Sequence, residues 1–274
     1  MQAHRCQTTS PAAAIDISKI RLKNLPQQRY YLARPDGKDS GRVLVLVHGI
    51  SRNVKMFIES VCPLVQGMGV TLVAPVFEKN RCKGYQRLGR NGEGPRADLT
   101  VDAILSEVSQ LTGWSGGKAY FYGHSAGAQF VQRYLFAHPQ RVQRAAMSAA
   151  GWYTFPDDHD YPFGIRPTTD LPGIDFAPAR FLRVPAAVFI GLQDTLRDEA
   201  LNVTRRVDRE QGYNRLERAR NWVNAMHTAA QQRGLPSRTE LFELDGIGHD
   251  HAEAIEVGQL NQLVLKWLFS GCTL

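Results

Sequence analysis

The chain has 274 residues, 43% hydrophobic and 22% charged, a composition typical of a folded globular protein with a sizeable core. No run approaches the roughly 18 uninterrupted apolar residues of a membrane-spanning helix, so no membrane span is expected. The formal net charge is +7, yet the arginine-rich stretch 197–220 holds seven arginines against five acidic residues. This mixture indicates a solvated surface and argues against a nucleic-acid partner, because a phosphate-binding face is strongly basic.

Short apolar runs alternate with helical patterns along most of the chain. The runs expected as strands are 19–24, 29–35, 42–49, 70–77, 118–124, 144–151, 185–194 and 239–246. Helical spacing of apolar residues marks 53–68, 96–113, 126–139, 213–236 and 253–271. Strands that are apolar on both faces are typical of a parallel sheet with helices on either side. The pattern therefore predicts one α/β domain over 1–274 with an open, mostly parallel sheet.

The segment 152–183 breaks this alternation. It carries five prolines and several aromatic residues without a clear period, and it is too long for a simple connection. The aromatic residues argue against disorder. We expect a lid or pocket wall over a site, with Trp152, Tyr153 and Phe155 lining the substrate pocket. Its residues Arg166 and Arg180 are candidates for contact with a substrate carboxylate and are equally well read as surface residues.

The N-terminal region lacks the sustained apolar core of a signal peptide, which favours a cytoplasmic protein. A leader removed beforehand would instead fit a secreted or periplasmic one. The four cysteines are Cys6, Cys62, Cys82 and Cys272. None forms a CxxC pair, so no zinc ribbon is expected. Disulfides Cys62–Cys82 and Cys6–Cys272 and four reduced thiols remain open alternatives. The sequence does not indicate the oligomeric state.

The stretch "FYGHSAG" places Ser125 between two glycines, after an expected strand and at the start of an expected helix. The five-residue pattern G-x-S-x-G is common, but this strand–turn–helix context is the one a nucleophilic serine requires. Small residues are needed because strand and helix pack closely around the turn. Ser125 would then present its hydroxyl at the carboxyl end of the sheet, where open α/β folds place their sites.

A serine hydroxyl needs a base to accept its proton, and the base needs a partner that orients it. His249 in "DGIGHDH" follows the last expected strand, and the flanking glycines let this loop turn tightly. His251 is its local competitor. His124 is expected to line the pocket or pack beneath it, because it neighbours the serine on the far side of the turn.

Asp194 in "VFIGLQDT" ends an apolar run at the carboxyl end of an expected strand. It is the first choice for the acid that orients the histidine. A helix N-cap is the alternative role for Asp194, and Asp198 is the alternative acid. The chain order Ser125, Asp194, His249 is the order of the G-x-S-x-G hydrolases.

Acyl transfer also needs donors for the negative oxygen of the tetrahedral intermediate. The first is the backbone N–H of Ala126, which follows the serine. The second is expected in "VHGISRN", at Ile50 or, failing that, at Ser51. Ser51 is also expected in the substrate pocket. His48 is expected to support this loop.

The motifs "VLVLVHGISRN", "FYGHSAG", "VFIGLQDT" and "DGIGHDH" together resemble the α/β-hydrolase superfamily, most closely its esterase and polyester-depolymerase-like branch. The resemblance covers residues 42–270 and departs from the lipase pattern in lacking an HGGG run. It implies an eight-stranded sheet flanked by helices, a triad of Ser125, Asp194 and His249, and no metal or organic cofactor.

The expected function is cleavage of carboxylic esters, including hydroxyacid esters, through an acyl-enzyme. The substrate would be a small molecule or an oligomer. A thioesterase, a peptidase, an acyltransferase and a non-catalytic binding protein remain as alternatives, because the fold hosts all of them.

Overall fold

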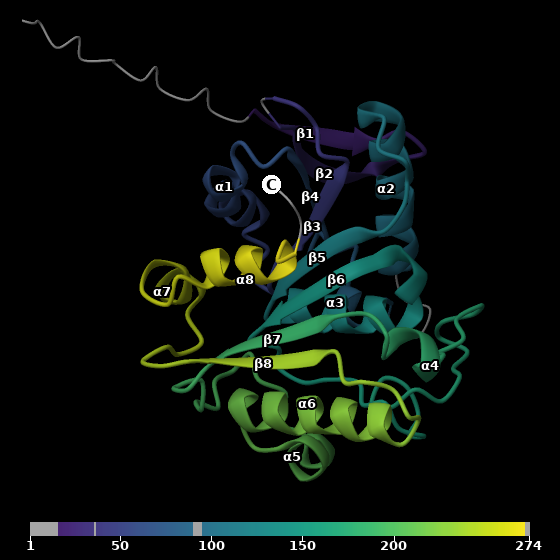
Figure 1. The fold of residues 1–274 in the computed structure, drawn as a ribbon. Helices are drawn as coiled ribbons and strands as arrows, with labels where there is room; N and C mark the ends of the chain where they lie inside the picture. Colours follow the sequence, from purple (N-terminus) through teal and green to yellow (C-terminus); the bar gives the residue numbers. More distant parts are fainter. Residues whose placement is uncertain (1–15, 36, 90–94, 272–274) are drawn as a thin grey trace, which may run out of the picture.

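A computed structural model describes residues 16–35, 37–89 and 95–271, and its central feature is a sheet of eight strands (Figure 1). The strands are β1 (Ile17–Leu22), β2 (Leu25–Ala33), β3 (Arg42–Val47), β4 (Val70–Val76), β5 (Ala119–His124), β6 (Val142–Ser148), β7 (Ala186–Gly191) and β8 (Thr239–Leu244). They lie in the order β1-β2-β4-β3-β5-β6-β7-β8. The pairs β1–β2 and β2–β4 are antiparallel, and every other pair is parallel.

Eight α-helices occur in the described part of the chain. They are α1 (Val54–Val65), α2 (Ala97–Thr112), α3 (Ala126–Ala137), α4 (Pro178–Phe181), α5 (Arg205–Gln211), α6 (Arg215–Gln231), α7 (His251–Glu256) and α8 (Leu260–Leu268). Short 3-10 turns lie at Tyr85–Arg87 and Pro139–Arg141. No described helix is long and apolar enough to cross a bilayer.

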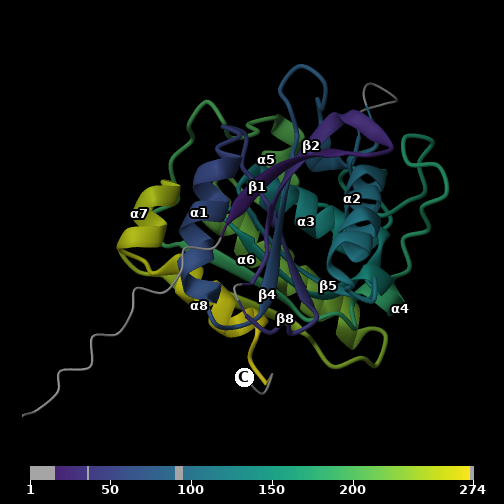
Figure 2. The same ribbon diagram turned by 90° about the horizontal axis from the view of Figure 1, so that it is seen from above.

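Two hydrophobic cores, one on each face of the sheet, hold these layers together. Leu44 and Leu46 of β3 join the core under α1 and α8, whereas Val43, Val45 and Val47 join the core under α2, α3 and α6 (Figure 2). Successive side chains of a strand point to opposite faces, so both faces of β3 are buried. The expected mostly parallel α/β sheet flanked by helices is confirmed.

Several expected details are corrected. The single helix expected over 253–271 is two helices, because the chain bends between α7 and α8, where Gln259 has a φ of 49°. The helix α5 was not expected. The stretch 197–220 is not simply a solvated surface, since Arg215 and Arg218 within it are fully buried.

The two described cysteines, Cys62 and Cys82, are free and buried. Cys62 belongs to the core on one face of the sheet and Cys82 to the core on the other. The sheet therefore separates the two thiols, and a disulfide between them is excluded. Cys6 and Cys272 lie outside the described residues.

The segment 152–183 is irregular apart from α4, and it packs firmly on the core under α3 and α6. The ring of Tyr153 stacks on Trp222 with centroids 5.0 Å apart, and Tyr161 stacks on Phe176. The peptide bond between Tyr161 and Pro162 is cis. This anchoring favours a fixed wall, and a lid function stays a prediction.

The first turn of helix α3 packs directly against the end of β3. A Cβ at Gly127 would lie 1.9 Å from the carbonyl oxygen of Val47, and a Cβ at Gly123 would lie 2.3 Å from that of Gly127. Both clashes are with backbone, which cannot swing away. These glycines therefore permit the close packing that brings the head of α3 to the carboxyl end of the sheet.

Replacing Gly127 by alanine is expected to lower the free energy of unfolding by about 3 kcal/mol, since the added methyl forces β3 and α3 apart. The melting temperature should fall by about 6–12 °C in a thermal melt. Gly117→Ala is the matched control, because its Cβ would meet nothing closer than 3.6 Å. Equal melting temperatures for the two variants would contradict this account of the packing.

Candidate active site

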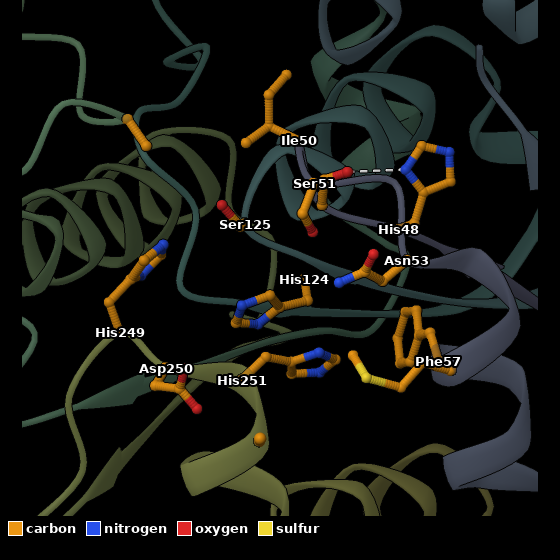
Figure 3. A pocket seen from close by; sticks show the side chains of 14 residues that line it. His48, Ile50, Ser51, Asn53, Phe57, His124, Ser125, His249, Asp250 and His251 are labelled. Atoms are coloured by element: carbon orange, nitrogen blue, oxygen red, sulfur yellow. Dashed lines mark hydrogen bonds between the residues drawn. The ribbon is translucent and has the colours of Figure 1, made fainter. Parts of the chain in front are cut away.

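Ser125 occupies the turn between β5 and α3 in a strained backbone conformation. Its φ is 53° and its ψ is −114°, a region that non-glycine residues rarely adopt. Its N–H donates to the carbonyl of Ser148 at 2.8 Å, which ties the turn to the end of β6. The conformation points the side chain away from the sheet toward a hollow at its carboxyl end, as Figure 3 shows.

The loops after β7 and β8 bring Asp194 and His249 together. His249 Nδ1 lies 2.9 Å from Asp194 Oδ2, and the Asp194 side chain is fully buried. The two loops meet closely, because a Cβ at Gly191 would lie 2.0 Å from the carbonyl oxygen of Ile247. In Figure 3 the Ser125 hydroxyl faces the ring of His249. Three residues far apart in sequence thus lie at one edge of the sheet.

The alternatives considered from the sequence lie elsewhere. Asp198 is bound by the guanidinium of Arg215, at 2.8 and 2.9 Å, and makes no hydrogen bond to His249. That ion pair holds the pKa of Asp198 below its usual range. His251 begins α7, and its ring stacks on His124 with centroids 3.9 Å apart.

Arg215 is the residue that sequence reasoning missed. It opens α6, it is only 1% exposed, and its Nη1 lies 3.4 Å from Asp194 Oδ1 while it binds Asp198. The Asp194 carboxylate therefore has His249 on one oxygen and Arg215 on the other. The signal in the sequence was weak, because one arginine in an arginine-rich stretch looks like a surface residue.

Three imidazole rings line the hollow side by side. His124 stacks on His251 and, more distantly, on His249, with centroids 5.7 Å apart. Burial, with a smaller contribution from these two rings, lowers the pKa of His124 well below its usual value. Its Nδ1 lies 2.9 Å from the hydroxyl of Ser148. Burial lowers the pKa of His251 to about 4, and its Nε2 has no hydrogen-bond partner among the described residues.

The loop after β3 approaches the other side of Ser125. The Nδ1 of His48 lies 2.8 Å from the Gly49 carbonyl oxygen (Figure 3). Its Nε2 accepts the N–H of Phe77. These two bonds require a neutral ring, and burial lowers the pKa of His48 to about 4. His48 therefore fixes the loop, and a Cβ at Gly49 would lie 3.6 Å from that of Ser125.

Two backbone donors remain near the serine. Ala126 is the first residue of α3, so its N–H has no partner within the helix. The N–H of Ile50 makes no hydrogen bond to another of the described residues. The Ile50 side chain is 48% exposed, and Figure 3 places it beside Ser125.

Two hollows meet at Ser125. The first, here the histidine-side hollow, has a volume of about 480 Å³ and is lined by Ser51, Phe57, His124, His249 and His251 among others. The second, here the arginine-side hollow, has a volume of about 270 Å³ and includes Arg87, Ala126, Gln129, Trp152 and Arg215 in its lining. Ile50, Ser125 and Ala200 line both.

The expected pocket residues thus divide into two groups. Ser51 and His124 line the histidine-side hollow, and Trp152 lines the arginine-side hollow. Tyr153 and Phe155 line neither, which corrects that expectation. Tyr153 is fully buried against Trp222, and Phe155 packs against the same core. The described residues contain no cluster of three or more histidine, cysteine or carboxylate side chains that could hold a metal ion.

The lowered pKa of His251 predicts a loss of stability in acid. In the unfolded chain this ring binds a proton below pH 6.5, but in the folded chain it does so only near pH 4. The free energy of unfolding therefore falls as the pH drops through this window, with about 2 kcal/mol from His251 at pH 5. His251→Phe, which keeps an aromatic ring, should lessen the loss between pH 7 and pH 5 by that amount in urea unfolding.

The control for this comparison is His159→Gln, whose imidazole is 55% exposed. Its stability should change with pH as that of the wild-type protein does. An identical pH dependence in His251→Phe and the wild-type protein would show that the buried ring does not control acid unfolding.

Solved structures resemble this chain over most of its length, while no family model and no curated protein sequence matches it. One is LpqC, a poly(3-hydroxybutyrate) depolymerase from Bordetella parapertussis, 27% identical over 95% of this chain and 91% of that one, with a TM-score of 0.75. Another is poly(aspartic acid) hydrolase-1 from Sphingomonas sp. KT-1, 24% identical over 89% of this chain and 94% of that one, with a TM-score of 0.75.

A more distant neighbour is FphF, a fluorophosphonate-binding serine hydrolase from Staphylococcus aureus, 12% identical with a TM-score of 0.60 over 93% of this chain and 98% of that one. Likeness at this identity bears on the fold alone. The shared sheet and the agreement of these neighbours confirm the resemblance drawn from the motifs. The chain has the α/β-hydrolase fold, and the solved structures that it resembles here are hydrolases.

Proposed function

We propose that this protein is a serine hydrolase that cleaves carboxylic esters through an acyl-enzyme intermediate. The observation that carries the proposal is the 2.9 Å contact between His249 Nδ1 and Asp194 Oδ2, beside a strained serine at the head of a helix. A carboxylate accepts hydrogen bonds only, so Nδ1 carries the proton of the neutral ring. Nε2 is then the basic nitrogen available to Ser125.

The proposed reaction has two halves. Ser125 Oγ attacks the ester carbonyl while His249 takes its proton, and His249 then returns that proton to the departing alcohol. Water, activated by the same ring, releases the acid from Ser125. Asp194 holds the ring and stabilises its charged form, and the N–H groups of Ala126 and Ile50 hold the oxyanion.

The two hollows favour a substrate that extends on both sides of the scissile bond. They meet at Ser125, so an acyl group and an alcohol can each occupy one of them. The neighbours at 27% and 24% identity are named for polymers, poly(3-hydroxybutyrate) and poly(aspartic acid). An oligomeric ester is therefore the substrate class that we favour, with Trp152 of the segment 152–183 as part of the acyl wall.

Replacing Ser125 by alanine should reduce kcat for an activated short-chain ester by about 10⁴-fold, because the nucleophile is lost. A fluorophosphonate probe should label the wild-type protein and not the variant. Ser106→Ala, on the exposed side of α2, is the matched control and should keep full activity.

Turnover by the Ser125→Ala variant at the wild-type rate would contradict the proposed mechanism. A substrate panel of esters, thioesters and amides distinguishes ester cleavage from the other acyl-transfer reactions. Absence of labelling and turnover in the folded wild-type protein would favour a binding protein on this fold.

Arg215 is expected to set the pH range of activity. Its positive charge lies 3.4 Å from Asp194. It therefore weakens the electrostatic stabilisation of protonated His249 by this carboxylate. In Arg215→Met the acid limb of the kcat/KM profile should move upward by about 0.5–1 pH unit, because the carboxylates of Asp194 and Asp198 are then no longer compensated. Loss of activity without any shift of that limb would assign Arg215 a purely structural role.

A further inference from the structure

The turn that follows β3 contains Arg52, a residue in an unusual backbone conformation. Its φ is 60°, in the left-handed region that glycine and asparagine adopt more readily than other residues. Its N–H donates to the carbonyl oxygen of Gly49 at 3.1 Å, which closes the turn 49–52. A strained conformation of this kind persists only where other contacts hold the residue in place.

The guanidinium of Arg52 makes such contacts, because it donates to two backbone carbonyls. Its Nη1 donates to the carbonyl oxygen of Ile50 at 2.8 Å, within the turn itself. Its Nε donates to the carbonyl oxygen of Phe77, also at 2.8 Å. Phe77 directly follows β4, the parallel neighbour of β3. One side chain thus joins the turn after β3 to the end of the next strand in the sheet.

Two buried aromatic rings support this connection. The guanidinium of Arg52 lies over the ring of Tyr85, 5.6 Å from its centroid. Tyr85 stacks on Phe77 with centroids 4.8 Å apart, and both rings are buried. The Tyr85 hydroxyl donates to the carbonyl oxygen of His48 at 2.8 Å. The guanidinium therefore rests on a part of the core that is itself bonded to the start of the turn.

These bonds set the direction of the two N–H groups expected as the second oxyanion donor. In a trans peptide the N–H points opposite to the carbonyl of the same group. The Gly49 carbonyl oxygen binds the N–H of Arg52 and Nδ1 of His48. The Ile50 N–H, in the same peptide, therefore points away from both. The Ile50 carbonyl oxygen binds the Arg52 guanidinium, so the Ser51 N–H points away from it.

Arg52 itself lies outside the substrate hollows. It is not among the described residues that line either hollow at Ser125. It lines a separate hollow, together with Lys19 and Lys55. An effect of Arg52 on the reaction would therefore act through the backbone of the turn.

We propose that Arg52 is a positioning residue for the oxyanion site, whose guanidinium holds the turn 49–52 against the end of β4 and so aims a backbone N–H of this turn at the developing oxyanion. Donors fixed in advance stabilise this charge strongly, because they need no reorganisation as it forms. Without the guanidinium, the turn would have to become ordered during the reaction. This inference rests on the proposed ester-cleaving function and identifies a residue that prepares its oxyanion site.

The test replaces Arg52 by asparagine, which tolerates a φ near 60° but is too short to reach both carbonyls. With 4-nitrophenyl butyrate as substrate, kcat should fall about 10–100-fold while KM stays within about 2-fold, because the lost stabilisation acts in the transition state. Arg52→Lys keeps a cationic donor that can reach one carbonyl and should lose only about 3–10-fold. Lys55→Met is the matched control, since it removes an exposed cation from the same outer hollow and should keep the wild-type kcat.

Inhibition by butylboronic acid separates the aim of the donors from a general loss of structure. Its boron bonds to Ser125 Oγ and becomes a tetrahedral anion, while His249 takes the serine proton. The adduct therefore resembles the transition state, and its inhibition constant should rise in Arg52→Asn by the factor by which kcat/KM falls. A thermal melt checks that the variant is folded. If Arg52→Asn does not fold, the same proportionality is expected in Arg52→Lys.

Wild-type kcat in Arg52→Asn, or a fall in kcat/KM without a matching rise in the inhibition constant, would overturn the positioning role while leaving ester cleavage intact. Failure of the proposed function would look different. Butylboronic acid would then not inhibit the wild-type protein, and Ser125→Ala would keep its turnover.

Discussion

The close approach of α3 to the end of β3 is the constraint on which the site depends. With Gly127 against the carbonyl of Val47, the chain must reverse between strand and helix within one residue. Ser125 takes that position at a φ of 53°, at a cost of about 1–3 kcal/mol. The packing of α3 offsets this cost, since all twelve of its residues are buried. The strain thus places the hydroxyl and is maintained by the core.

Asp194 is fully buried, so the few charged groups close to it determine the electrostatics around it. Asp194 and Asp198 share the single guanidinium of Arg215, which leaves one net negative charge beside His249. In the proposed reaction, a net negative charge favours the protonated imidazole that forms as Ser125 loses its proton. The neighbouring rings of His124 and His251 stay neutral, because burial lowers the pKa of both. Among the three rings, His249 is the one that makes a hydrogen bond to a described carboxylate, that of Asp194.

Much of this arrangement could be predicted from the sequence, because it is encoded locally. Apolar strands, the glycines around Ser125 and the glycine-flanked His249 are each visible within a few residues. Arg215 could not be found in this way, since it reaches Asp194 from 21 positions away and looks like its solvated neighbours. The aromatic residues of 152–183 led to a wrong prediction of pocket residues for a related reason. Aromatic content indicates burial, but whether Tyr153 faces a pocket or Trp222 depends on packing that only the folded chain defines.

The residues of the proposed reaction and the walls of the hollows come from different parts of this fold, and one segment belongs to both. The turn at Ser125 and the loops bearing Asp194 and His249 follow directly from the ends of strands, which the sheet holds rigidly. The walls of the hollows come from connecting segments, which can change without disturbing the sheet. The segment between β7 and α6 belongs to both groups, because it carries Asp194, lines both hollows at Ala200, and leads into Arg215. A substitution in this segment would therefore disturb the surroundings of Asp194 and the walls of both hollows together.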